Sequence, residues 1–316
     1  MTMSFGLHAG QQNVTLQELR RLWKFADQSG FDWVSGWDHF QETPPKDHNG
    51  DCFESVTTMA LLAADTRQVR VGCLVFSINY RHPAVLANAL VTIDHISNGR
   101  MECGLGAGWH EVEYRGYGIP FEPIRIRQDQ LEEGVQVIRL LFTQEAADFE
   151  GKYFKLNQAR CNPKPVQKSP RIWIGGLGER RTLRTAAKHA DGWNAPYISA
   201  EEFSRKSGIL DDWCAKERRD PASVLRSVNV GFYMGATEAT AARHAEEMRA
   251  DWGALLEQRQ GFFTGTPGQV IEQVAAYQKA GAARLNIGVR APYDWDALHA
   301  FVEEVLPAFG VKPRPK

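Results

Sequence analysis

The chain has 316 residues, of which 43% are hydrophobic and 24% are charged, and its formal net charge is −1. These values are typical of a soluble globular protein with an ample core, and the near-zero charge argues against a nucleic-acid or anionic-membrane partner. The length suits one large α/β barrel. Because no low-complexity tract or linker divides residues 1–316, we expect a single domain.

The cysteines and the amino-terminal stretch exclude further classes. Five cysteines are scattered without C-x-x-C spacing, which argues against a disulfide framework and a structural zinc site. The stretch MTMSFGLHAGQQNV lacks the basic and apolar regions of a signal peptide. No apolar stretch approaches the roughly 18–20 residues that span a bilayer. We therefore expect a cytoplasmic protein without membrane contact.

One helix-then-strand unit recurs along the chain. In LQELRRLWKFADQSG, residues 16–30, apolar residues recur at helical spacing after Thr15, a helix-capping residue, and Gly30 ends the pattern. The β-rich run FDWVSGW follows directly. The same order returns in LVTIDHISNG before RMECGLG, in RTLRTAAKHAD before GWNA, and in QVIEQVAAYQKAG before ARLNIGV. Apolar strands between amphipathic helices indicate a parallel sheet covered on both faces.

Eight such strands are predicted. They cover about 4–8, 32–37, 70–76, 101–106, 171–175, 191–195, 226–233 and 283–289. Eight strands separated by helices favour a (β/α)8 TIM barrel over a doubly wound sheet. Two longer excursions interrupt the unit: residues 41–53, and residues 148–170, which we expect to form a hairpin-like insertion near the barrel mouth.

Polar residues and glycines follow several of these strands, where a barrel enzyme carries its site. They are His8, Asp38 and His39, residues 73–80, the stretch GAGWH and the stretch GGLG at 175–178. The histidine beside Asp38 is either a satisfied core group or a general acid/base of near-neutral pKa tuned by that aspartate. The same two interpretations apply to His110.

The stretch ECGLGAGWHEVEYRGYGIPF, residues 102–121, resembles a dinucleotide loop only superficially. Its glycines read G-x-G-x-G rather than G-x-G-x-x-G, and they lie three units into the chain instead of in the first. HEVEY ends in Tyr114 where a zinc protease motif needs a histidine, and the other histidines are not paired at ligand spacing, so we predict no metal. The glycines instead fit a backbone that closely approaches a flat cofactor.

The stretch IGGLGERRTLR is different, because glycines at the end of a strand and before a helix leave unpaired N–H groups. The turn formed by Gly175, Gly176, Leu177 and Gly178 is therefore either a phosphate site or only a turn. Arg180 and Arg181 oppose the dipole of the following helix, so they face either solvent or an anion.

Four stretches together resemble the luciferase-like superfamily of flavin- and deazaflavin-dependent oxidoreductases. They are SGWDHF, VRVGCLVFSINYRHPAVLANALVTIDHISNGR, GLGAGWHEVEYRGYGIPF and PRIWIGGLGERRTLRTAAKHADGWN, and the similarity covers nearly the whole chain. The resemblance implies a (β/α)8 barrel with insertions, usually a homodimer. An Asp–His pair after the second strand is most similar to the branch that uses coenzyme F420.

Residue by residue, the resemblance places Asp38 and His39 beside the cofactor ring, with His39 acting as acid or base. It puts a strained cis-peptide bulge that backs the ring at Cys73 and Leu74, and a polar ring contact at His110. It puts the cofactor phosphate at Gly175, Gly176, Leu177 and Gly178. Substrate would then stack over the ring near Trp37, Trp109 and residues 41–53.

Two positions depart from the F420-dependent sugar-phosphate and secondary-alcohol dehydrogenases. Those enzymes carry an aromatic residue shortly after the histidine and a glutamate in the loop after the fourth strand, where this chain has Thr43 and Ala107. The departure makes those two activities doubtful and leaves His39 as the leading candidate for proton transfer.

We therefore expect hydride transfer between F420 and a small organic substrate. The alternative is an FMN-dependent monooxygenase that uses reduced flavin and O2, and a flavin or F420 reductase would be the partner that supplies reduced cofactor. A non-catalytic flavin carrier and a metal-dependent barrel hydrolase are further alternatives.

Overall fold

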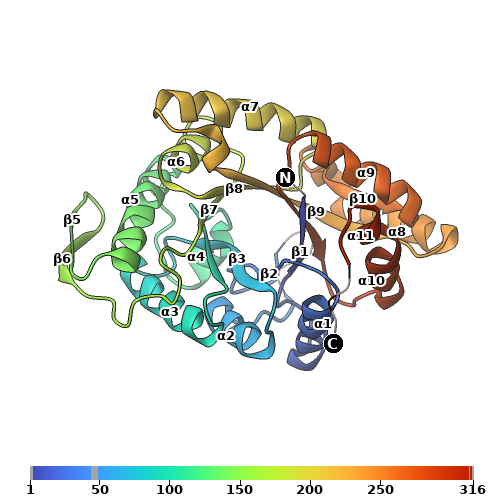
Figure 1. Ribbon diagram of the computed structural model, residues 1–316, viewed down its shortest axis with the longest axis horizontal. Coiled ribbons are helices and arrows are strands. Elements are labelled where there is room, and N and C mark those ends of the chain that lie inside the picture. Colours follow the sequence, from blue (N-terminus) through green and yellow to red (C-terminus); the bar gives the residue numbers. More distant parts are fainter. Residues whose placement is uncertain (1–2, 44–48, 313, 315–316) are drawn as a thin grey trace.

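Eight parallel strands close into a barrel in the computed structural model, which describes residues 3–43, 49–312 and 314 (Figure 1). The barrel strands are β1 (Ser4–Ala9), β2 (Trp33–Gly36), β3 (Arg70–Ser77), β4 (Met101–Gly106), β7 (Ile172–Gly175), β8 (Gly192–Pro196), β9 (Leu225–Met234) and β11 (Arg284–Val289). Pairing of β8 with β9 and of β11 with β1 closes the ring. The predicted (β/α)8 barrel and its eight strands are thus confirmed.

Helices surround this barrel, and α4 lies inside the outer ring of helices in this view (Figure 1). They are α1 (Leu16–Gln28), α2 (Ser55–Asp65), α3 (Pro83–Ile96), α4 (Glu111–Gly116), α5 (Ile124–Thr143), α6 (Thr182–His189), α7 (Ala200–Lys216), α8 (Glu238–Trp252), α9 (Pro267–Lys279), α10 (Trp295–Ala300) and α11 (Leu306–Ala308). The side chain of Thr15 accepts a hydrogen bond from the Glu18 backbone, so it caps α1 as predicted. Of the helices in the described part of the chain, none has the length and apolar character needed to cross a membrane.

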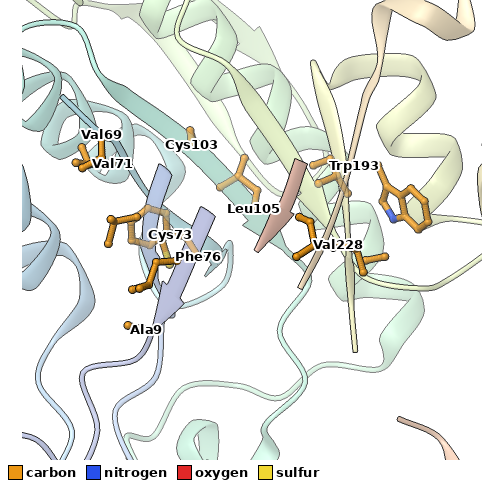
Figure 2. Close-up of a cluster of buried hydrophobic side chains, with 14 of the residues drawn as sticks. Ala9, Val69, Val71, Cys73, Phe76, Cys103, Leu105, Trp193 and Val228 are labelled. Carbon is orange, nitrogen blue, oxygen red and sulfur yellow. The ribbon is translucent and has the colours of Figure 1, made fainter. Parts of the chain in front are cut away.

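Strand β4 explains the spacing of the central glycines. Its side chains alternate, so Cys103 and Leu105 join the cluster of buried hydrophobic side chains in Figure 2. Glu102, Gly104 and Gly106 take the opposite, inward positions. A Cβ at Gly104 would lie 2.1 Å from the carbonyl oxygen of Cys73 on the neighbouring strand. Gly104 therefore admits the backbone of β3, and the expectation that these glycines let a flat cofactor approach stays a prediction.

The insertion at 148–170 holds the predicted hairpin, and its expected place near the barrel mouth stays a prediction. The hairpin pairs β5 (Ala147–Glu150) with β6 (Lys155–Ala159), and it lies outside α5, away from the barrel axis (Figure 1). Glu133 of α5 accepts hydrogen bonds from the backbones of Tyr153 and Phe154 and fixes the hairpin there. The sequence also missed β10 (Phe262–Gly265), which pairs with β9 outside the closed ring. The second segment expected to interrupt the repeated unit covers residues 41–53, and its residues 44–48 lie outside the described residues.

Candidate active site

A buried carboxylate lies at the centre of the site at the carboxyl end of the barrel. Glu113 of α4 is fully buried and accepts hydrogen bonds from His39 Nδ1 at 2.6 Å and from the Tyr80 hydroxyl at 2.8 Å. His110 Nδ1 lies 3.1 Å from the same carboxylate, and the Gln41 backbone N–H donates to it at 2.9 Å. Loops after β2, β3 and β4 thus meet at one side chain.

These donors keep Glu113 charged. Burial raises the pKa of the carboxyl group, but hydrogen bonds from His110 and His39 outweigh burial and hold the pKa well below its usual range. A charged carboxylate here favours the His39 tautomer that carries its proton on Nδ1. The other nitrogen, Nε2, is then left to exchange a proton. The His39 side chain is 14% exposed, so it is not sealed inside the core.

Asp38 and His39 are adjacent in sequence, but their side chains have different partners. Asp38 binds Arg81 through two hydrogen bonds, at 2.8 and 3.0 Å, and accepts another from the Ser77 backbone. The hydrogen-bond partner of Asp38 is therefore Arg81 and not His39, and the expectation that Asp38 tunes His39 stays a prediction. Asp38 instead anchors the end of β3, and Glu113 is the partner of His39.

Strand β3 carries a bulge on the side where it pairs with β4. The register between β3 and β4 shifts between Cys73 and Phe76, and the cis peptide bond joins Leu74 and Val75, one residue later than expected. The side chains of Cys73 and Leu74 are buried in the core, so these residues can contribute backbone only. A Cβ at Gly106 or at Gly175 would lie 2.5 or 2.6 Å from Val75, so these glycines make room for that side chain.

The glycine turn after β7 leaves donors open. Gly176 has a φ of +126°, and its N–H donates to the Asn194 carbonyl, while the Leu177 carbonyl accepts from Lys206. In the part of the chain that the structure describes, no hydrogen bond uses the N–H groups of Leu177 and Gly178. The turn therefore has the donor set that a phosphate group requires.

The two arginines after this turn have different surroundings. Arg181 pairs with Asp129 at 2.5 Å and with Glu132 at 3.7 Å on α5, so it serves helix packing. Arg180 is exposed, and within the described residues it has no ion pair. Of the two, Arg180 remains available to an anion bound at the turn.

Glu113, His39 and His110 also form a compact set of possible metal ligands, with ligand atoms within 4.8 Å of one another. The carboxylate is already engaged by Tyr80 and by backbone N–H groups, which suits proton handling better than metal coordination. The sequence-based expectation of no metal stays a prediction.

Sequence reasoning placed His39 and His110 at the site, and the structure brings them together with ring centroids 5.7 Å apart. It missed Glu113 and Tyr80. The signal for Glu113 was present in HEVEY, because residues three apart on a helix share a face and His110 directly precedes α4.

The fold and the site define a barrel of the luciferase-like class. The family model described as luciferase-like monooxygenase matches residues 2–284, and the chain belongs to this family. An uncharacterized protein of Mycobacterium tuberculosis is 32% identical over 174 residues, and the match covers 55% of this chain and 61% of that protein. The chain therefore spans about three fifths of the length of that relative.

Two of the other relatives represent two different cofactor groups. An F420-dependent glucose-6-phosphate dehydrogenase of Intrasporangium calvum is 28% identical and matches 89% of this chain and 91% of its own. An FMNH2-dependent dimethylsulfone monooxygenase of Pseudomonas putida is 25% identical and matches 83% of this chain and 80% of its own. This chain is thus similar to enzymes of both groups.

Solved structures share the fold at low identity. An F420-dependent secondary alcohol dehydrogenase in complex with an F420-acetone adduct superposes with a TM-score of 0.86 at 19% identity, over 98% of this chain and 99% of its own. An EDTA monooxygenase from Chelativorans superposes with a TM-score of 0.82, also at 19% identity, over 99% of this chain and 95% of its own. At such identities the likeness establishes the barrel only.

Proposed function

We propose that this chain is an oxidoreductase that transfers a hydride between coenzyme F420 and a small organic substrate, with His39 moving the accompanying proton. The observation that carries the proposal is the pairing of His39 with a buried, charged Glu113 at the barrel mouth. Hydride transfer to or from a flat cofactor ring, in the absence of a metal, needs a side chain that supplies or accepts the accompanying proton. The relatives that are F420-dependent glucose-6-phosphate dehydrogenases support this choice of cofactor.

The residues fit the parts of such a cofactor. The bulge at Val75 offers backbone and one side chain to a ring, and the open N–H groups of Leu177 and Gly178 suit a phosphate-bearing tail. When bound, F420 supplies the carbon that gives or takes the hydride. Glu113 holds the Nδ1 proton of His39, so that Nε2 gives a proton to the substrate or accepts one from it. A homodimer and a reductase partner remain part of the proposal.

A second candidate is an FMN-dependent monooxygenase that uses reduced flavin and O2. Thr43 and Ala107 favour it, because they replace the aromatic residue and the glutamate of the F420-dependent dehydrogenases that this chain resembles. Thr43 is buried and its hydroxyl donates to Gln12, so it presents no ring to a substrate.

Paired titrations test the cofactor. We expect saturable binding of F420 and much weaker binding of FMN, each followed by calorimetry on the full chain. Tight FMN binding with oxygen consumption coupled to substrate oxidation would replace the proposal with the second candidate. Binding of neither cofactor would reduce the resemblance to one of fold.

A matched pair of glycine variants locates the binding site. In Gly175→Ala the new Cβ meets Val75, so we expect F420 affinity to fall about tenfold or more. In Gly208→Ala, on α7, the new Cβ meets no atom within 4 Å, and affinity should not change. Equal affinities in the two variants would place the cofactor elsewhere.

A further inference from the structure

Two imidazole nitrogens meet one oxygen of the buried carboxylate of Glu113. The Oε2 atom lies 2.6 Å from His39 Nδ1 and 3.1 Å from His110 Nδ1. The other oxygen, Oε1, accepts hydrogen bonds from the backbone N–H groups of Phe40 and Gln41, which fix the carboxylate so that Oε2 faces the imidazoles. In the described part of the chain, this is the one set of three or more His, Cys, Asp or Glu side chains whose ligand atoms lie close enough together to hold a metal ion.

The charge of Glu113 is not balanced by an arginine or a lysine. Among the described residues, no guanidinium or ammonium group lies within ion-pair distance of this fully buried, charged carboxylate. Asp94 shows that amide donors can satisfy such a group, because it is equally buried and accepts two hydrogen bonds from Gln167. The neighbours of Glu113 differ, because an imidazole can exchange its proton for a metal ion. Buried charges in proteins are either paired or bind a metal, and Glu113 has the neighbours for the second arrangement.

The donor set fits zinc. Two imidazole nitrogens and one carboxylate oxygen are typical ligands of Zn²⁺, whereas Mg²⁺ and Ca²⁺ take oxygen ligands. The ligand atoms of a tetrahedral zinc ion lie about 3.4 Å apart. Those of the present set lie within 4.8 Å of one another, so each imidazole needs to move away from Oε2 by less than about 1 Å. His39 lies in the loop after β2 and its side chain is 14% exposed, which gives an ion access from that side.

We propose that His39 Nδ1, His110 Nδ1 and Glu113 Oε2 bind one zinc ion, with a water molecule as the fourth ligand, and that the ion inhibits the enzyme. The inhibition rests on the proposed function. Zinc takes the lone pair of Nδ1, so the Nδ1 proton of His39 leaves and the neutral ring carries its proton on Nε2 instead. Nε2 then has no lone pair to accept a proton, and to give one away would leave an imidazolate. The ion and the proton compete for the same atoms, so the site works without a metal and is switched off by one.

Calorimetric titration of the full chain with zinc chloride, after removal of metal ions by a chelator, tests the site. We expect saturable binding of one zinc ion per chain, about 100-fold or more tighter than binding of Mg²⁺ under the same conditions. Mg²⁺ is the control ion because it requires oxygen ligands in octahedral geometry. Absence of zinc binding, or equal affinity for the two ions, would overturn the proposal.

Two variants each remove one ligand: His39→Gln and His110→Gln. Each should weaken zinc binding about 100-fold or more, since even the loss of a group that only orients a ligand costs 10–100-fold. His244→Gln is the matched control, because His244 is also buried and lies 3.2 Å from Asp294, yet within the described residues no third ligand joins this pair. Zinc affinity that is unchanged in His110→Gln, or lost equally in His244→Gln, would contradict the assignment.

Cobalt gives a measurement that needs no variant to fold. Co²⁺ in place of zinc in the wild-type protein should show the strong visible absorption of a four- or five-coordinate ion, and added zinc should abolish it. The weak spectrum of the six-coordinate aqueous ion, at cobalt concentrations that saturate the protein, would mean binding to the surface and would overturn the proposal even if zinc bound.

The failures of the two proposals are distinguishable. In assays of F420-dependent turnover, zinc should inhibit with a constant close to its calorimetric Kd, and EDTA should restore the rate. Zinc binding without inhibition would remove the inhibitory role and leave the site. Loss of F420 binding in the metal-free wild-type protein would remove the proposed function, while the zinc titration, which needs no cofactor, would still decide whether the site exists.

Discussion

Two buried glutamates, at opposite ends of the barrel, have partners of different kinds. At the floor, Glu102 is fully buried inside the barrel and contacts three arginines, with Arg284 at 2.9 Å, and the indole of Trp173 at 2.7 Å. At the mouth, Glu113 is equally buried, but its partners are histidines, a tyrosine and backbone N–H groups.

The difference lies in what the partners can do with protons. Guanidinium groups stay charged at every accessible pH, and although burial raises the pKa of Glu102, Arg284 and Arg70 lower it to about 2. That cluster is fixed and can only stabilise. Imidazole is a side chain that can gain or lose a proton, so the surroundings of Glu113 suit the proton transfer that we propose for His39. The comparison predicts that floor variants lose stability and mouth variants lose rate.

The largest expected effect is on catalysis. His39→Ala removes the proposed proton carrier, and we expect turnover to fall about 10²–10⁴-fold, equivalent to ~3–5 kcal/mol of barrier. F420 affinity and the unfolding midpoint should change little. Steady-state kinetics and calorimetry measure the two effects, with the exposed His299→Ala as the control. Full activity in His39→Ala would remove the assignment.

The floor variant should behave in the opposite way. Glu102→Gln leaves Arg70 and Arg284 beside a neutral group, and we expect a loss of about 3 kcal/mol in the free energy of unfolding. Urea titration measures it, and turnover of the folded protein should persist. The carboxylate has a lowered pKa, so its contribution is present above about pH 4.5 and lost as the pH falls toward 2. A stable but inactive Glu102→Gln protein would break the comparison.

The sequence alone predicts the elements of the barrel and one residue of the mouth site, but not the partner of that residue. The strands and the barrel follow from local periodicity, and His39 follows from its place after a strand. The partner of His39 could not be found in that way, because Glu113 reaches it across 74 positions in the chain. Asp38 is next to His39 in the sequence, but adjacency does not reveal side-chain direction, and the hydrogen bonds of Asp38 go to Arg81.

The floor illustrates the same limit. Glu102 belongs to the quoted glycine stretch, yet Arg284 lies 182 positions away and meets it only because the barrel closes. Local patterns therefore predict elements and their ends, whereas ion pairs across the barrel depend on closure. The glycines of β4 show this too, since their role depends on the bulge of the neighbouring strand rather than on their own spacing.

His8 gives a smaller effect that sharpens the comparison. Burial, together with the nearby charge of Arg290, lowers the pKa of His8 to about 3. The unfolded chain therefore binds a proton between about pH 6.5 and 3 that the folded chain does not, and stability falls as the pH falls through this window. At pH 5 the loss relative to neutral pH is about 2 kcal/mol from this group.

His8→Gln should therefore flatten the pH dependence of stability. Urea unfolding at pH 7.5 and at pH 5 measures the difference, and His299→Gln, an exposed variant, should leave it as in the wild type. If His8→Gln loses as much stability on acidification as the wild type, then the buried histidine is not the source.

The smallest expected effect separates the two arginines after the glycine turn. Arg180→Ala should weaken F420 about two- to fivefold at low salt, because an exposed cation contributes little and its contribution is screened. Arg181→Ala should leave F420 affinity unchanged and instead loosen the contact between α6 and α5, where Arg181 binds Asp129. Titrations at low and high salt measure both variants. The reverse outcome, a salt-dependent loss in Arg181→Ala alone, would mean that the ion pair with Asp129 opens to receive the anion. In that case an ion pair at the mouth would change partners when the anion binds, which would set the mouth further apart from the floor, where the ion pairs of Glu102 are fixed.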